Sequence, residues 1–175
     1  MNLASFAELA VRLVNSAASG ANADPLRGRD AFREFLADQP ALTAAVTQQD
    51  LDRLRLLREE LAAIFALCHA ERDAEAMSRL NDLAMIHPVL PVLTAHDGES
   101  WHQHLSWSGS AADRLATTAV FGLTSVIARY GLDRLGACPI PGCHRVFADA
   151  REDGPGTYCT EHRVQEIIGS LRAGG

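Results

Sequence analysis

The sequence predicts a mainly α protein with one β-hairpin (α+β), in which a helical body is followed by a small C-terminal treble-clef-like knuckle. Three observations predict this fold. Apolar residues recur at steps of three and four along several segments before residue 131, which is the spacing of amphipathic helices. Residues 88–107 favour strands instead, and within them 101–107 alternate between apolar and polar side chains. Three of the four cysteines lie between residues 138 and 159. We therefore expect two domains, at 1–133 and 134–175.

Helical spacing predicts five helices in the first domain. The expected helices span residues 3–17, 29–37, 49–69, 71–83 and 111–130. The longest follows Thr47, a good helix start, and repeats leucine at steps of three and four. Gln39-Pro40 is expected to end the second helix. Gly131 is the expected C-cap of the last.

The stretch at 88–107 predicts the hairpin. Asp97-Gly98 is a two-residue turn signal between its strands. Pro88 and Pro91 cannot donate to a ladder, so they favour an edge strand.

Four aromatic residues of this hairpin are candidate ligand-binding residues: Trp101, His102, His104 and Trp107. Alternation puts the two tryptophans on one face and the two histidines on the other. The tryptophans could line a small-molecule pocket or simply belong to the core. The histidines could bind a metal or an acidic ligand, or be exposed polar residues.

The C-terminal cysteines have the spacing of a metal site. The pattern C-x4-C-x15-C-x2-H places Cys138 and Cys143 in a Pro-Gly knuckle, and Cys159 and His162 one turn apart on an expected helix. Two such pairs can close around one tetrahedral zinc. His144 competes with His162 as the fourth ligand. Free core cysteines and disulfides are the alternatives. Four protein ligands leave no open position, so the zinc would be structural.

Charge and composition exclude some classes of function. The net charge is −6, and no run approaches 18 apolar residues, so no membrane span is expected. The apolar N-terminal run is interrupted by Glu8 and Arg12, which indicates an amphipathic helix in place of a signal peptide and a cytoplasmic protein. No Ser-His-Asp arrangement, phosphate loop or paired acidic motif is present, so we expect no enzyme.

Two segments carry a resemblance to a known family. The tail CPIPGCHRVFADAR, followed by YCTEHR, resembles the CGNR-type zinc finger, although the Cys-Gly-Asn-Arg signature is missing and His162 stands where the family has a closing cysteine. The body, with its Glu-Leu-Ala-x-x-Leu-Val-Asn start at 8–15, resembles the ABATE domain that precedes this finger. The resemblance implies a bacterial, stress-induced transcription regulator. Its body would sense a small-molecule effector or form a homodimer, and its finger would bind DNA.

The charge of the tail bears on the expected DNA binding. Four arginines would contact DNA: Arg145, Arg151, Arg163 and Arg172. After residue 130, however, five arginines stand against six acidic residues, and DNA affinity depends on the number of phosphates neutralised. The last helix also carries an apolar stripe from Val164 to Leu171. The alternative function is therefore a module that does not bind DNA, in which the zinc unit is a structural cap.

Overall fold

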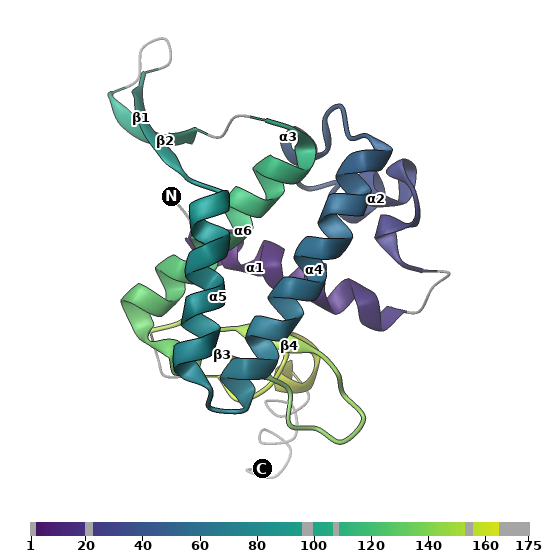
Figure 1. The fold of residues 1–175 in the computed structure, drawn as a ribbon, viewed down its shortest axis with the longest axis vertical. Coiled ribbons are helices and arrows are strands. Elements are labelled where there is room, and N and C mark those ends of the chain that lie inside the picture. The colour runs from purple at the N-terminus through teal and green to yellow at the C-terminus, as the bar shows by residue number, and fades with distance from the viewer. Residues whose placement is uncertain (1–2, 20–22, 96–99, 107–108, 153–155, 165–175) are drawn as a thin grey trace, which may run out of the picture.

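The computed structural model describes residues 3–19, 23–95, 100–106, 109–152 and 156–164. It confirms a mainly helical fold with a β-hairpin and a C-terminal Cys/His cluster (Figure 1). The helices are α1 (Leu3–Asn15), α2 (Arg29–Phe35), α3 (Pro40–Thr43), α4 (Gln48–His69), α5 (Asp73–Ile86) and α6 (Ala111–Tyr130). The strands are β1 (Leu90–Thr94), β2 (His102–Ser106), β3 (Leu135–Ala137) and β4 (Val146–Ala148). Among the described helices, none combines the length and apolar character that a membrane span needs.

Side-chain caps fix where the two long helices begin. The hydroxyl of Thr47 accepts a hydrogen bond from the Asp50 N–H, and the Asp50 carboxylate accepts one from the Thr47 N–H. Ser110 and Asp113 form the same reciprocal pair at the start of α6. At its other end α6 stops at Gly131, whose φ of 100° lies where glycine is the favoured residue. These boundaries agree with those expected from the sequence.

The structure differs from the prediction at two local features. Helix α2 already ends at Phe35, and Pro40 occupies the first turn of the separate helix α3, where its missing N–H has no helical partner to lose. The hairpin pairs Thr94 with His102, whereas a two-residue turn at 97–98 would pair Thr94 with Trp101. Residues 97–98 themselves lie outside the described residues.

The core is formed mainly by α1, α4 and α6 and extends into the C-terminal unit. Its largest fully buried side chains are Phe32, Phe65, Leu13, Leu26, Leu36, Leu51, Leu54, Leu61, Ile64, Leu80, Leu115 and Leu123. Strand β3 packs on α4 and β4 packs on α1, and Leu135 and Val146 join the same core. In Figure 1 the β1–β2 hairpin projects from one end of the helical body, and β3–β4 lies at the opposite end.

Candidate metal centre

Four side chains from two segments meet at the C-terminal unit: Cys138, Cys143, Cys159 and His162. Their ligand atoms all lie within 4.8 Å of one another. The Cys138 sulfur is 3.2 Å from His162 Nδ1, and the Cys143 and Cys159 sulfurs are 3.9 Å apart. Bonds of about 2.3 Å to sulfur and 2.0–2.1 Å to nitrogen put the ligand atoms of a tetrahedral zinc roughly 3.5–3.8 Å apart. The group is therefore close enough to hold one metal ion, and its ligand types and spacing fit zinc.

The first ligand pair is positioned by the turn between β3 and β4. The Cys143 N–H donates to the Ile140 carbonyl at 2.9 Å, which closes the turn. Gly142 has a φ of 79°, a left-handed conformation that a side chain would strain. The Cys138 N–H donates to the Arg145 carbonyl at 2.8 Å, so the hairpin ladder continues into the knuckle. Both sulfurs thereby come to the same side of the turn.

The second ligand pair lies at the start of a helix. Residues 160–164 are helical, and the Arg163 N–H donates to the Cys159 carbonyl at 2.9 Å. Residues three apart share a helix face, so Cys159 and His162 point to the same place. His144 is exposed and lies outside the group, so His162 is the fourth member.

The surroundings of Cys138 favour metal binding. Burial raises the pKa of Cys138, but hydrogen bonds from the backbone of Cys159 and Ile140 and from His162 outweigh it and lower that pKa to about 7. Burial raises the pKa of Cys159. A thiol that ionises near neutral pH suits a metal that binds thiolate. Four protein ligands leave no open position, which is typical of a structural site.

The metal-binding unit is attached to the helical body by Asn15 at the end of α1. The Asn15 side chain donates to the Val146 carbonyl at 3.0 Å and accepts from the Val146 N–H at 2.8 Å. Leu135 and Val146 are 4% and 7% exposed in the common core. The division expected at residue 133 thus separates two segments that share one core. The sequence reasoning missed this role of Asn15.

Two of the arginines expected to contact DNA are paired with acids. The Arg145 guanidinium lies 2.6 Å from the Glu161 carboxylate, and this ion pair joins the knuckle to the helix at 160–164. Arg151 lies 2.7 Å from Asp149, a carboxylate that is itself buried. Burial raises the pKa of Asp149, but the hydrogen bonds and charge of Arg151 outweigh it, so that the pKa is lowered. These pairs give the surface mixed charge where the prediction needs positive charge.

The other two expected DNA contacts differ in what the structure describes of them. Arg163 is half-buried on the helix at 160–164. Desolvation raises the pKa of Glu8 on α1, and the positive charges of Arg12 and Arg163 oppose the rise. The charge of Arg163 therefore reaches Glu8 on α1. Arg172 lies outside the described residues.

The expected ligand-binding residues of the hairpin remain a prediction. Trp101 is 74% exposed, just before β2. His102 and His104 pair through their backbones with Thr94 and Val92, while their side chains lie outside the described part of the chain. Trp107 also lies outside it.

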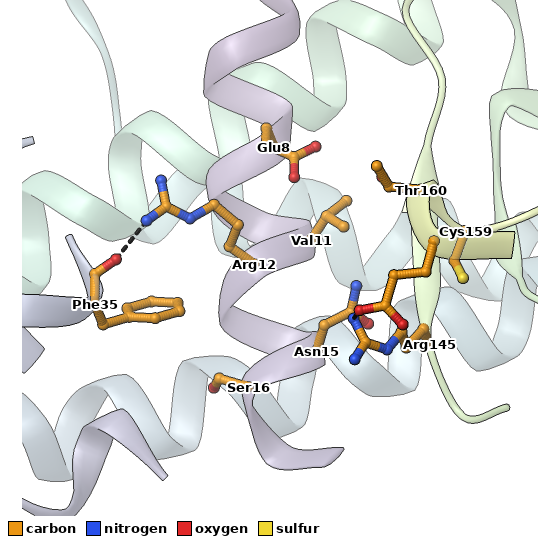
Figure 2. A pocket seen from close by; sticks show the side chains of 10 residues that line it. Glu8, Val11, Arg12, Asn15, Ser16, Phe35, Arg145, Cys159 and Thr160 are labelled. Carbon is orange, nitrogen blue, oxygen red and sulfur yellow. Dashed lines mark hydrogen bonds and ion pairs between the residues drawn. The ribbon is translucent and has the colours of Figure 1, made fainter. Parts of the chain in front are cut away.

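A pocket of about 350 Å³, called the junction pocket below, lies between the helical body and the metal-binding unit (Figure 2). It is lined by Glu8, Val11, Arg12, Asn15 and Ser16, by Phe35, and by Arg145, Cys159, Thr160 and Glu161. In Figure 2, Arg12 extends from α1 to the Phe35 carbonyl, while Glu8 points toward the metal-binding unit. Glu8, Arg12 and Asn15 share one face of α1, because they are spaced three or four residues apart. This polar face on a largely apolar helix is the sequence feature that could have indicated the pocket.

These features define a helical domain with a zinc-finger-like unit docked at its C-terminal end. Residues 7–133 match the model of the ABATE family, whose description is "Putative stress-induced transcription regulator". The match covers more than half of the chain, and the chain belongs to this family. The Cys/His cluster lies beyond the matched residues. No curated protein matches the chain.

Proposed function

We propose that this protein is a zinc-stabilised transcription regulator, in which a small molecule bound at the junction pocket controls a DNA-binding C-terminal unit. The observation that carries the proposal is that residues 159–161 belong at once to the pocket, to the metal-binding group and to the start of a helix. They begin the helix that carries Arg163, they include a metal ligand, and they line the pocket together with α1. A ligand that contacts both sides of the pocket would therefore set the position of that helix. The proposal includes no catalytic activity, because four protein ligands leave no open metal position.

The chemistry of the pocket favours a small zwitterion. Arg12 and Arg145 bring positive charge to the pocket, and Glu8 and Glu161 bring negative charge. Arg12 is held by Asp38 at 2.8 Å, and its guanidinium also stacks over the Phe35 ring. A compound with one amine and one carboxylate would complement both signs.

Thermal unfolding of the zinc-loaded protein with individual amino acids tests the sensing part. We expect at least one of them to raise the melting temperature of the wild type and to lose this effect in Glu8→Gln. If no amino acid stabilises the wild type, or if Glu8→Gln keeps the full shift, this assignment of the pocket is overturned.

Selection from random DNA duplexes at low salt tests the DNA-binding part. We expect the zinc-loaded protein to enrich a sequence, and its affinity to fall steeply with salt because counterions are released. Arg163→Ala should weaken binding and reduce the salt slope by about one phosphate contact. The matched control is Arg79→Ala on α5, an exposed arginine paired with Glu60 and distant in the chain from the zinc unit.

The ion pairs favour a second candidate function, in which the zinc unit is a structural cap that does not bind DNA. Arg145 and Arg151 are already paired with carboxylates, so fewer arginines are left to neutralise phosphate. This candidate predicts no enrichment of any duplex, with zinc still required for stability. The selection experiment thus separates the two functions.

A further inference from the structure

Exposed apolar side chains gather at the hairpin end of the molecule. In the described part of the chain, seven of the nine large hydrophobic residues that are exposed belong to this end: Leu56, Met85, Ile86, Leu90, Val92, Leu93 and Trp101. Their exposed fractions run from 45% at Val92 to 81% at Met85. Single exposed apolar residues are ordinary, but a group of this size at one end of the molecule marks an interaction surface.

An apolar groove adjoins this group. It lies between α4, α5 and α6, holds about 330 Å³, and has a floor that includes Leu54, Leu57 and Ala116. Leu56 and Ile86 form part of its wall. The charged residues at its rim are already paired: Arg53 with Asp113, and Glu60 with Arg79 at 3.2 Å. Seven of the ten residues that line the groove are Leu, Ile or Ala, so the groove suits aliphatic side chains.

The hairpin has apolar side chains on both faces. Leu90 and Val92 lie on one face of β1 and Leu93 on the other, and they are 57%, 45% and 69% exposed. The hairpin stands away from the helical body (Figure 1), so the body does not cover these side chains. A two-stranded hairpin alone is marginally stable in water, and it gains stability when an apolar face is covered.

We infer that a second copy of this chain provides the cover, with the hairpin of each copy lying in the α4–α5–α6 groove of the other. Ile86 and His87 line the groove, and β1 begins at Leu90, so the groove and the root of the hairpin are neighbours within one copy. A two-fold axis beside that root brings each hairpin to the partner's groove. The contact is then the same on both copies and closes at a dimer.

The exposed apolar area agrees with what a stable dimer needs. Typical side-chain areas follow from the free energy of burying an aliphatic side chain and from the area that an aromatic one buries. With these areas, the seven side chains expose on the order of 500 Å². An ordinary stable interface buries about 800 Å² on each partner, roughly 60% of it apolar. The group therefore supplies the apolar share of one such interface. This inference goes beyond the proposed function, because the dimer forms with or without DNA.

Light scattering coupled to gel filtration of the zinc-loaded full chain tests the dimer. We expect the wild type to have twice the chain mass of 18.9 kDa, with a fraction of monomer that rises on dilution. Leu93→Glu on the hairpin and Leu56→Glu on the groove wall should each give a monomer, because each places a charge in the apolar contact. Both positions are exposed, so thermal unfolding followed by circular dichroism should show folded variants.

The matched control is Ala66→Glu, which places the same charge at an exposed apolar residue of α4 that lies beyond Leu56 and outside the apolar group. It should remain a dimer. A monomeric wild type at its highest soluble concentration overturns the inference, and so does a dimer that persists in Leu93→Glu or Leu56→Glu. Failure of the DNA selection would leave these masses unchanged, so the two proposals are tested separately.

Discussion

At the scale of single residues, Asn15 attaches the metal-binding unit to the helical body. Its amide satisfies both the N–H and the carbonyl of Val146, the first residue of β4. Asn15→Ala leaves both backbone groups without these partners at a partly buried place, so we expect a loss of about 1–3 kcal/mol in the free energy of unfolding. Urea unfolding of the zinc-loaded protein measures it.

The control for this prediction is Asn81→Ala on α5, where the asparagine is exposed. Its free energy of unfolding should stay within about 0.5 kcal/mol of the wild type, as is usual for surface substitutions. Equal effects at Asn15 and Asn81 would contradict the role of Asn15 in attaching the metal-binding unit.

Asp50 links the starts of two helices and makes stability depend on pH. It is 3% exposed, and it accepts hydrogen bonds from the Thr47 N–H, the Thr47 hydroxyl and the Ala112 N–H. Burial raises its pKa, but hydrogen bonds from Ser110, Thr47 and Ala112 outweigh burial and lower the pKa to about 2. Because the pKa of the folded state lies below that of the unfolded state, ionised Asp50 stabilises the fold above about pH 4.

Asp50→Asn should therefore be less stable than the wild type by about 2 kcal/mol at pH 7. The difference should shrink as the pH falls from about 4 through about 2, below which the wild-type carboxylate is protonated in both states. Urea unfolding of both proteins across this range measures it. A difference that does not change with pH would show that ionisation of Asp50 is not its source.

At the scale of elements, the crossing of α1 over α6 depends on Gly122. A Cβ at this position would lie 2.2 Å from the Ala7 nitrogen and 2.3 Å from the Phe6 carbonyl carbon, which are backbone atoms. Alanine has the higher helix propensity, by about 1 kcal/mol, but the two backbones would have to move apart. Gly122→Ala should destabilise the protein by about 1–3 kcal/mol, since overpacking exceeds the gain in propensity.

The matched substitution for comparison is Gly28→Ala at the start of α2. A Cβ added to Gly28 would have no neighbouring atom within 4 Å, and the φ of −171° is extended backbone that any residue adopts. Thermal unfolding of the two variants should give a clearly lower melting temperature only for Gly122→Ala. A neutral or stabilising Gly122→Ala would mean that α1 and α6 can separate freely.

Periodicity and caps were enough to predict the long helices, but not α3, β3 or β4. The leucine spacing and Thr47 predicted α4, and Gly131 predicted the end of α6. The register of the hairpin was not predictable from Asp97-Gly98, because the pairing of Thr94 with His102 is shifted by one residue from the register of that turn. A turn signal gives the place of a hairpin more reliably than its register.

At the scale of the whole molecule, the sequence predicted the metal ligands but not their attachment to the body. Ligand spacing is local, so it can be read from the chain. The bonds between Asn15 and Val146 join residues 131 positions apart. The pairing of Arg145 with Glu161 likewise joins two separate segments, the knuckle and the helix at 160–164. Contacts of these two kinds follow from packing, which no single segment encodes.

Because the metal-binding unit shares the core of the body, loss of metal should affect both. A structural zinc contributes on the order of 10 kcal/mol to the folding of small zinc units. Strand β3 packs on α4 and β4 on α1, so releasing the ligands loosens a wall of the common core. We expect a chelator to lower the melting temperature and to speed amide hydrogen exchange in β3, in β4 and in the last turn of α1. Exchange in α5 should change little.

Two cysteine substitutions separate metal loss from other effects of the chelator. Cys143→Ala removes a ligand and should reproduce the exchange pattern of the chelated wild type. Cys68 lies outside the metal-binding group, and burial raises its pKa to about 11, which keeps the thiol protonated and a poor ligand. Cys68→Ala should therefore keep stoichiometric zinc, and amide exchange in β3 and β4 should stay as slow as in the wild type. If chelation leaves the last turn of α1 as protected as before, the metal stabilises only its own loop, and the body holds β4 through Asn15 without it.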